Sequence, residues 1–528
     1  MHTHVAMSIR TESASLRPFA TFADLAAAIA RRHRGVAWLD SGLPLDGLGR
    51  FSFLAFDPFH TFTARADDNG RDPGDPLAAL RNELARHSPA AAHASPPHPL
   101  FPFAGGAIGY ISYETGARLE RIAPAAPDEL GLPDLAFHFY DGLIAHDHAT
   151  GETTLVANPV HRADAPAILA RLRAALADAA ASHSAIRNPP SAIPAPAPVP
   201  DLSRAAYDAA IARIRALIAS GDVYQVNFTQ RFTTPFPPPV QLKAGSGAAW
   251  KRHGHPAHDS GEARASSPCF APDTGGAAHR PRPGWPCHMH ASPSAETAAA
   301  IDLHLRLRQR SPAPFAAYLD FGDHRIVSSS PERFLQKRGP HLETRPIKGT
   351  RPRGATPADD ARLRADLAAS EKDRAELLMI VDLERNDLGR VCRPGTIHVE
   401  DLYRLEPHPT VHHLVATVRG ELAPGRDLFD ALRATLPGGS ITGAPKIRAM
   451  QIINALEPVR RHVYTGAIGW IGFNGDADLN IAIRTITCAR GRAYYHVGGG
   501  IVQDSSSASE YQETLDKGRA MHAALSGF

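Results

Sequence analysis

Four carboxylates stand as two pairs, and the members of each pair are three residues apart. Asp373 and Glu376 form one pair, and Glu510 and Glu513 form the other, each within a segment whose pattern predicts a helix. Side chains at this spacing share one face of a helix, so the carboxylates repel each other unless solvent, a base or a metal ion intervenes. Two such pairs facing each other across a cleft would make an all-oxygen site suited to Mg²⁺. On spacing alone, each pair is more often a solvated helix face, so the spacing does not establish a metal site.

One lysine stands among arginines. The run RPIKGTRPRG places Lys348 close to Arg345, Arg351 and Arg353. Guanidinium groups pair well with carboxylates, so this cluster suits an acidic substrate. Burial and neighbouring cations would lower the pKa of Lys348 from about 10.4, and a neutral lysine amine is a nucleophile. The alternative is a surface loop of solvent-facing charges.

Two glycine-rich segments could bind an anion. LPGGSITGAPKIRAMQII is a glycine-rich turn leading into a helix, with Lys446 and Arg448 in the first turns, as in an anion site at a helix N-terminus. The order of its residues does not match a Walker A motif. HVGGGIVQDSS places Gly498, Gly499 and Gly500 after a predicted strand, where backbone N–H groups could meet a carboxylate. Three glycines alone more often mark a β-bulge.

Helices and strands are predicted throughout the chain. Helices are expected at 165–181, between the capping residue Ser203 and the stop at Gly221, and at 301–309. Strands are expected in GRFSFLAFDP, FPFAGGAIGYISYETG and VYQVNFTQRF. This mixture predicts an α+β fold in which helices pack on mainly antiparallel sheets.

Composition changes along the chain suggest its organisation. We expect an N-terminal subdomain over 1–185, a proline-rich linker over 186–202 and a C-terminal domain over 203–528. Residues from about 234 to 299 are rich in Gly, Pro, Ser and His, and we interpret them as a disordered insertion in the C-terminal domain. The histidines of this stretch, with Cys269 and Cys287, match no closed metal site.

The overall composition excludes several classes of protein. The 528 residues are 43% hydrophobic and 21% charged, which fits a globular enzyme, and a net charge of +3 does not indicate a nucleic-acid or membrane surface. No apolar stretch predicts a membrane span or a signal peptide. Four scattered cysteines do not form a disulfide framework, so a reducing cytoplasm is expected.

Nine segments together resemble the chorismate-utilising enzymes. In chain order they are GDVYQVNFTQR, SSSPERF, RPIKGTRPRG, ELLMIVDLERNDLGRV, HHLVATVRGEL, LPGGSITGAPKIRAMQII, YTGAIGWIGF, LNIAIRT and GGGIVQDSSSASEYQETLDK. The resemblance spans 201–520 apart from the insertion, and it is weaker in the N-terminal third. It implies a large α/β sandwich of two intertwined subdomains, with chorismate and Mg²⁺ in a cleft of the C-terminal one.

The resemblance also implies roles for individual residues. Glu376 and Glu513 match the family's Mg²⁺ ligands, with Asp373 and Glu510 supporting them through water. Glu332 matches the general acid/base, and His413 matches a histidine near the C4 hydroxyl of chorismate. The positions that match substrate-binding residues are Gly349, Thr350, Tyr464, Arg484, Gly498, Gly499, Gly500 and Lys517.

Two positions indicate which branch of the family the chain resembles. Isochorismate and salicylate synthases carry a lysine that activates water where this chain has Gln225, and glutamine cannot act as a base. Anthranilate synthase large subunits usually read PIAGT where this chain reads PIKGT. The lysine form resembles aminodeoxychorismate synthase component I, which implies that Lys348 attacks chorismate covalently before ammonia displaces it. The product would be 4-amino-4-deoxychorismate, the precursor of p-aminobenzoate and folate.

The source of nitrogen and the competing functions follow from the same comparison. The chain contains no Gly-x-Cys-x-Gly nucleophile elbow, so ammonia is expected from a separate glutamine amidotransferase subunit or from solution. WLDSG resembles the family's tryptophan-binding strand through Ser41, and tryptophan binding stays open at this point. The competing hypotheses are anthranilate synthase component I and a catalytically silent subunit that binds chorismate or tryptophan.

Overall fold

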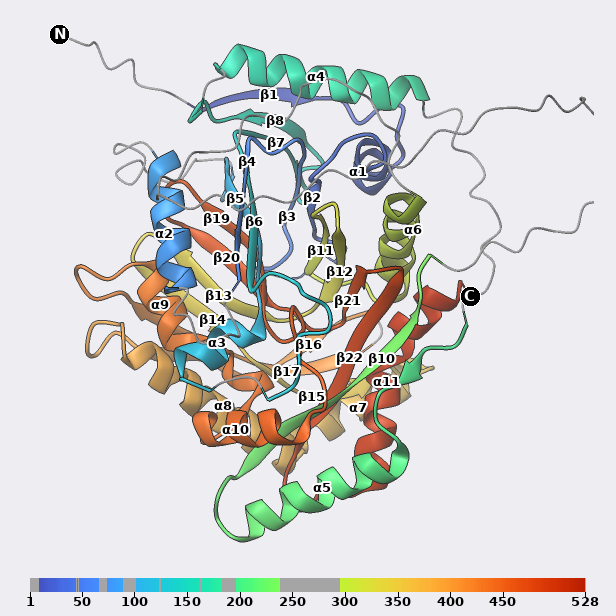
Figure 1. The fold of residues 1–528 in the computed structure, drawn as a ribbon, viewed down its shortest axis with the longest axis vertical. Coiled ribbons are helices and arrows are strands. Elements are labelled where there is room, and N and C mark those ends of the chain that lie inside the picture. Colours follow the sequence, from blue (N-terminus) through green and yellow to red (C-terminus); the bar gives the residue numbers. More distant parts are fainter. Residues whose placement is uncertain are drawn as a thin grey trace, which may run out of the picture. The chain divides into compact units, whose positions relative to one another are not determined.

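Two large β-sheets form the framework of the described part of the chain (Figure 1). A computed structural model describes residues 9–43, 45, 47–65, 74–88, 101–122, 125–161, 164–182, 196–237, 295–409 and 411–527. The described residues before 238 and after 294 belong to one compact unit. All strand pairs within it are antiparallel, as the sequence predicts.

The first sheet has twelve strands and joins the two ends of the chain. In spatial order it contains β1 (Arg10–Ala14), β8 (Thr153–Ala157), β7 (Gly142–Asp147), β3 (Phe51–Ala55), β2 (Ala37–Asp40), β11 (Phe315–Asp320), β12 (His324–Ser330), β21 (Thr485–Ala489), β22 (Arg492–Ile501), β10 (Gln225–Pro235) and β18 (Gly443–Ala444), with β9 (Val199–Pro200) beside β10. Strand β2 pairs with β11, so residues from both sides of the proline-rich stretch share this sheet.

The second sheet has ten strands and likewise contains strands from both sides of the proline-rich stretch. Its order is β15 (Ile347–Pro352), β17 (Val411–Glu421), β14 (His341–Arg345), β13 (Arg333–Arg338), β20 (Ala477–Ile481), β19 (Ala467–Gly472), β5 (Gly106–Ile111), β6 (Leu135–Tyr140) and β4 (His60–Ala64), with β16 (His398–Pro407) beside β17. Here β5 pairs with β19 over six residues.

The sheets pack face to face around one apolar core and carry helices on their other faces. The shared core joins Phe53 and Leu319 of the first sheet to Tyr110 and Trp470 of the second. Helices α1 (Phe22–Ala30), α4 (Ala165–Ser182), α6 (Ala295–Arg310) and α11 (Ser507–Ser526) share a core with the first sheet. A third core holds α2 (Pro76–His87), α3 (Tyr113–Leu119), α5 (Arg204–Ala219), α7 (Pro357–Ala369), α8 (Glu371–Gly389), α9 (Leu428–Thr435) and α10 (Lys446–Leu456). The predicted α+β sandwich is confirmed.

Local sequence signals explain several of these helices. The Ser203 side chain accepts from the Ala206 N–H and caps α5, and a positive φ of 81° at Gly221 follows its end. The Ser370 side chain caps α8 in the same way. In α8, Leu377, Ile380 and Val381 are buried, whereas Leu378 is 42% exposed.

Some predicted boundaries differ from the structure. The segment around Lys348 is not a loop but strand β15, because its backbone pairs with β17 from Ile347 to Pro352. The strand predicted at FPFAGGAIGYISYETG ends at Ile111 and gives way to α3, which the Ser112 side chain caps. Most of the predicted insertion, 238–294, and most of the predicted linker lie outside the described residues. None of the described helices combines the length and apolarity that a membrane span needs.

Candidate active site

The candidate residues come from distant segments and converge around Lys348. Four charged groups act on the pKa of this lysine, namely Glu376 of α8, Lys517 and Glu513 of α11, and Glu332 between β12 and β13. Both sheets contribute to this convergence, since β15 of the second sheet carries Lys348, while β22 of the first sheet lies beside α11 and supplies the glycine run. The structure therefore brings together the nucleophile, the acid/base and both carboxylate pairs predicted from sequence.

The amine of Lys348 lies in an environment that favours its neutral form. Burial is the largest effect and lowers the pKa of Lys348, and the positive charge of Lys517 acts in the same direction. The carboxylates Glu376, Glu332 and Glu513 partly oppose this change. The amine donates a hydrogen bond to the backbone carbonyl of Ser440 over 3.1 Å, which fixes its position. A positioned amine with a lowered pKa can act as a nucleophile.

Glu332 is suited to carry a proton. Its side chain is buried, and burial raises its pKa, while the nearby Ser440 hydroxyl and Lys348 act against this shift. The Ile347 N–H lies 3.4 Å from Glu332 Oε1, which places the carboxyl next to the start of β15. A carboxyl group with a raised pKa can donate a proton to a departing oxygen near neutral pH.

The arginines around Lys348 do not form the predicted substrate cluster. Arg345 forms an ion pair with Glu406, Arg351 lies 2.8 Å from Asp373, and Arg353 lies 2.7 Å from Asp360. Protein carboxylates therefore occupy all three guanidinium groups, and Lys517 supplies the positive charge that lowers the pKa of Lys348. The sequence does not reveal these pairings because the partners lie on other elements.

The four carboxylates fall into different electrostatic states. Burial and a nearby carboxylate raise the pKa of Glu376 and of Glu510, whereas an ion pair of 2.7 Å with Lys517 helps to lower the pKa of Glu513. Asp373 pairs with Arg351. Glu376 has a longer ion pair, 3.8 Å from Lys372, and Glu510 forms no ion pair among the described residues.

These residues fit a divalent cation. Glu510 Oε2 is buried and has no hydrogen-bond partner among the described residues. The position that a Cβ on Gly499 would occupy lies 3.0 Å from this oxygen and 3.6 Å from Glu513 Oε1, so the glycine leaves room beside both carboxylates. Oxygen ligands around such a space are what Mg²⁺ prefers. Among the described residues, no three of these carboxylates have ligand oxygens that all lie within 4.8 Å of one another.

His413 presents one free ring nitrogen. It lies on β17 opposite Thr350, and the Thr350 hydroxyl is 3.0 Å from its Nδ1. Burial and the charge of Arg484 lower the pKa of His413 well below its usual value, so the ring is neutral. Its Nε2 is buried without a partner in the described structure, and it is therefore available to a ligand. Thr350 and Arg484 both lie close to His413.

The glycine run lies inside β22 instead of after it. Gly498, Gly499 and Gly500 pair with β10, and the pairing of β21 with β22 ends at Tyr495. The backbone edge of these three glycines that faces away from β10 therefore has no strand partner in the described part of the chain. A Cβ at Gly498 would lie 2.1 Å from the Phe228 carbonyl, and one at Gly500 would lie 2.0 Å from Gln225 Nε2, so close packing requires glycine at both positions.

The other predicted residues have separate surroundings. Tyr464 is buried and stacks on His496 with ring centroids 5.0 Å apart. Gly349 adopts a φ of 76°, and a Cβ there would lie 2.9 Å from that of Asp373. Lys446, which the sequence suggests for anion binding, forms a buried ion pair with Asp387 and donates to the Thr435 carbonyl. Its role is structural.

Sequence reasoning missed two residues beside the site. Ser440 contacts Lys348 through its carbonyl, and no local motif signals this contact. Glu384 is buried, accepts from the Thr344 hydroxyl over 2.9 Å, and has a pKa raised well above normal by burial and by the charge of Glu332. It follows Asp373 by eleven residues, which is about three helical turns, so a helical projection would have placed both on one face.

Gln225 completes this environment. It is fully buried on β10, and neither atom of its side-chain amide has a hydrogen-bond partner among the described residues. It lies against Gly500, as the glycine geometry shows. A buried amide without partners costs free energy unless a ligand or water satisfies it.

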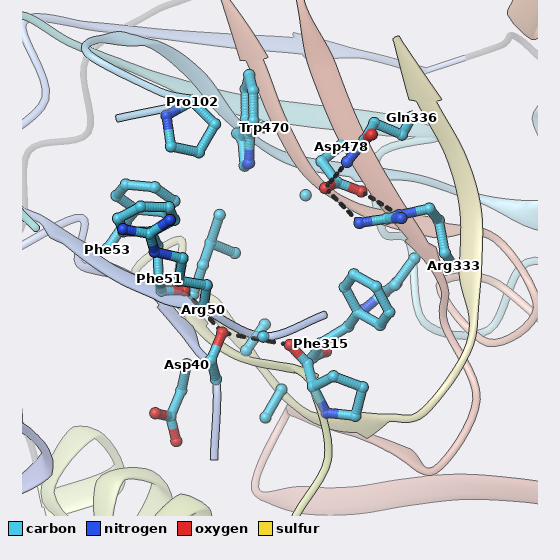
Figure 2. A pocket seen from close by; sticks show the side chains of 18 of the residues that line it. Asp40, Arg50, Phe51, Phe53, Pro102, Phe315, Arg333, Gln336, Trp470 and Asp478 are labelled. Atoms are coloured by element: carbon cyan, nitrogen blue, oxygen red, sulfur yellow. Dashed lines mark hydrogen bonds and ion pairs between the residues drawn. The ribbon is translucent and has the colours of Figure 1, made fainter. Parts of the chain in front are cut away.

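A separate cavity of about 290 Å³ lies between the sheets and includes Ser41 in its lining. Figure 2 shows Phe53, Trp470, Arg333 and Phe315 around the space. The Ser41 hydroxyl donates to the Phe51 carbonyl over 2.7 Å. The site thus has an aromatic lining together with paired charges such as Arg333 and Asp478.

Comparison with known protein families decides the assignment. Residues 37–244 and 287–523 match the family described as chorismate binding enzyme, which is more than half of the chain. This chain is a chorismate-binding enzyme. The match includes every predicted catalytic, substrate-binding and metal-binding position named above.

Known relatives of this chorismate-binding enzyme carry two different names. It is 39% identical to aminodeoxychorismate synthase component 1 of Klebsiella aerogenes, over 92% of each chain. It is 38% identical to anthranilate synthase component 1 of Streptomyces coelicolor, over 91% of this chain and 81% of that protein. The solved anthranilate synthase component I from Streptococcus pneumoniae TIGR4 superimposes with a TM-score of 0.68 at 29% identity, covering 91% of this chain and 93% of the other.

Proposed function

We propose that this enzyme is an aminodeoxychorismate synthase component 1, which replaces the C4 hydroxyl of chorismate with an amino group. The observation that carries the proposal is the amine of Lys348, whose pKa burial lowers and which lies among Glu332, Glu376 and Glu513. The relatives named aminodeoxychorismate synthase component 1 support it. Those named anthranilate synthase component 1 are similarly close in sequence, so that activity is the second candidate.

The proposed first step forms a covalent bond to Lys348. The neutral amine attacks C2 of the ring, the double bond shifts, and the C4–O bond breaks. Glu332 gives its proton to the departing oxygen, which leaves as water, and then takes the proton that the new Lys348 adduct releases. The raised pKa of Glu332 and the lowered pKa of Lys348 favour these protonation states.

The proposed second step transfers nitrogen. Ammonia forms a bond to C4 while the C2–N bond to Lys348 breaks, and a proton of the incoming nitrogen ends on the released amine. The pyruvyl group stays on the ring, so the product is 4-amino-4-deoxychorismate. Gln225 has no base to offer to a water molecule, which disfavours addition of water to the ring.

The carboxylates would hold Mg²⁺ in this reaction, with Glu376 and Glu513 as ligands and Asp373 and Glu510 supporting them through water. The ion would neutralise the C1 carboxylate and act as an electrophile toward the C4 oxygen. Arg484, Thr350, Gly349, Tyr464, Lys517 and the three glycines of β22 are proposed to position the substrate. His413 would face the C4 hydroxyl through its free Nε2.

Ammonia is proposed to come from a separate glutamine amidotransferase subunit. The name component 1 of the relatives supports a partner protein. The purified chain should therefore use ammonium salts but not glutamine, and addition of the glutaminase subunit should make glutamine a substrate. Turnover of glutamine by the chain alone would contradict this proposal.

The cavity between the sheets is proposed to bind tryptophan. Its volume of about 290 Å³ is near the lower end of ligand cavities, about 300 Å³, and its aromatic and charged lining suits an amino acid with a large ring. Equilibrium dialysis with labelled tryptophan tests this assignment, and absence of bound tryptophan at a high tryptophan concentration would contradict it.

Product identification tests the main proposal. The purified protein, with chorismate, Mg²⁺ and ammonium salts, should give a 4-amino product that retains the pyruvyl group in mass spectrometry. Formation of anthranilate, which lacks that group, would establish the second candidate instead. Isochorismate would overturn both, and absence of turnover with intact chorismate binding would indicate a silent binding subunit.

A further inference from the structure

A cluster of two histidines and a glutamate lies apart from both sites described above. His60 begins β4, whereas Glu83 and His87 lie on the last two turns of α2. His60 Nε2 is 2.9 Å from Glu83 Oε1, and His87 Nε2 is 3.2 Å from the same oxygen. Three potential ligand atoms from two elements therefore point at one place.

The geometry of this cluster is close to that of a metal site. Among the residues that the structure describes, it is the only group of three or more His, Cys, Asp or Glu side chains whose ligand atoms all lie within 4.8 Å of one another. Metal–ligand distances of 2.0–2.1 Å in a tetrahedral site place the ligand atoms about 3.3 Å apart. Small side-chain rotations would bring the three atoms to that spacing.

The contacts of Glu83 leave one of its carboxylate oxygens for a metal ion. Its side chain is 11% exposed, and Arg86 lies 2.6 Å from Oε2, the oxygen that faces away from the histidines. Oε1 is left to the two imidazoles. Outer-shell partners of this kind orient a carboxylate ligand and are a regular part of metal sites.

Aromatic rings enclose the same place. The ring of His87 packs against Phe59 and Phe139, with centroids 5.2 and 5.3 Å away, and the His60 ring packs against Phe139 at 5.4 Å. The His161 ring stacks on Phe59, with its centroid 6.1 Å from that of His87. The aromatic rings cover one side of the cluster, whereas the His60 side chain is 37% exposed, so His161 or water is near enough to complete the coordination.

We propose that His60, Glu83 and His87 bind one Zn²⁺ ion that ties α2 to β4. Two imidazoles and one carboxylate are a ligand set that zinc proteins use, whereas Mg²⁺ prefers oxygen ligands throughout. Both imidazoles lie within hydrogen-bond distance of the same carboxylate oxygen, and a zinc ion would replace these two hydrogen bonds with metal–ligand bonds. The site is distinct from the acidic pairs of α8 and α11, which offer only oxygen ligands.

The role of the ion would be structural. Helix α2 also contacts α9, since Arg81 lies 2.7 Å from Asp427 and Arg433 forms an ion pair with Asp75. A metal link would therefore hold α2 between β4 and α9. Binding to the folded state alone should raise the midpoint of thermal unfolding as zinc is added.

Zinc binding to the full-length protein tests the proposal. The measurement uses competition with a chromophoric zinc chelator in excess Mg²⁺, in a chain that carries Cys269→Ser and Cys287→Ser to remove thiolate ligands. One Zn²⁺ per chain is expected. His60→Asn and His87→Asn should each weaken binding by about 100-fold or more, because losing a ligand costs more than losing an outer-shell partner. His398→Asn, at an exposed histidine 3.1 Å from Glu400, is the matched control and should change nothing.

A second variant and a second readout keep the test decisive. Glu83→Gln preserves the size of the side chain and some of its hydrogen bonds, so this variant should fold even if the histidine variants fold poorly. Because it lacks the carboxylate charge, it should still weaken zinc binding. Co²⁺ in the same site should give visible absorption without thiolate charge-transfer bands. Failure of the parent chain to retain zinc, or equal retention by all three cluster variants, would overturn the proposal.

Discussion

The ammonium group of Lys517 lies 2.7 Å from Oε1 of Glu513, one helical turn before it, and 3.0 Å from the Gly498 carbonyl oxygen. A lysine therefore neutralises one of the proposed metal ligands in the ion-free state. Glu510, one turn earlier on the same helix, has a buried oxygen without a partner. Of these two carboxylates, Glu513 therefore has a positively charged partner and Glu510 has no ion pair among the described residues.

Removal of the Glu513 charge should raise the Mg²⁺ requirement. Glu513→Gln is expected to increase the Mg²⁺ concentration for half-maximal activity by about tenfold or more, because a ligand and its charge are both lost. The matched variant Asp373→Asn should have a smaller effect, since Asp373 is proposed to support the ion only through water. Titration of activity against Mg²⁺ measures both, and an unaltered curve for Glu513→Gln would remove this residue from the metal site.

Loss of the Lys348 amine should abolish most turnover. Lys348→Ala and Lys348→Arg are both expected to lower kcat by about 100-fold or more, because neither side chain is a nucleophile at this position. Chorismate affinity should stay largely intact, as measured by equilibrium binding. Intact-mass analysis of the quenched parent enzyme should show an adduct of chorismate minus water on Lys348. Undiminished turnover by Lys348→Ala would exclude the covalent route.

The pH profile should report Glu332 and Lys348 together. In the reactive form, Glu332 and Lys348 carry one transferable proton between them. The rate therefore falls at low pH, where both groups are protonated, and at high pH, where neither is. Burial raises the pKa of Glu332 and lowers that of Lys348. The acidic limb of kcat/KM should therefore lie above pH 4.5 and the alkaline limb below pH 10.5. Glu332→Gln should remove the alkaline limb, because Lys348 then titrates alone and only its neutral form reacts; the rate should rise with pH through the pKa of Lys348, and an unchanged profile would assign the limbs to other groups.

The buried ion pair between Lys446 and Asp387 should matter for stability. Lys446→Met leaves the Asp387 carboxylate buried without its partner, and breaking such a pair costs about 3 kcal/mol or more. Arg385→Met, on the same helix as Asp387, removes an exposed pair with Asp382 and should cost about 1 kcal/mol or less. Urea unfolding measures both variants. Equal midpoints would show that the buried pair contributes no more than the surface pair.

Much of the framework could be predicted from the sequence because it depends on local signals. Ser203 caps α5 where the pattern places it, and the carboxylates of α8 and α11 lie on helices at the spacing that puts them on shared faces. The roles of Lys348, Glu332 and the metal ligands came from motif resemblance and stay predictions. Their convergence around one amine depends on strand order, which no local pattern contains.

The interpretations that failed or were missed involve long-range partners. Arg345, Arg351 and Arg353 face carboxylates on other elements, so the sequence could not distinguish them from free cations. Lys446 pairs with a residue 59 positions earlier in the chain. The zinc cluster likewise joins a strand to a helix, and the short spacing between Glu83 and His87 gave no sign that His60 would lie beside them.

The interleaving of strands has a consequence for fragments of this protein. Residues 37–40 and 106–111 pair with β11 and β19, so a polypeptide starting at the proline-rich stretch would expose two long backbone edges in its sheets. Unpaired edges of this kind attract other chains and promote aggregation. The C-terminal part of the chain, which carries the predicted catalytic residues, therefore needs strands β2 and β5 to pair with its sheet edges. We expect the two parts to fold and to be expressed only as one polypeptide.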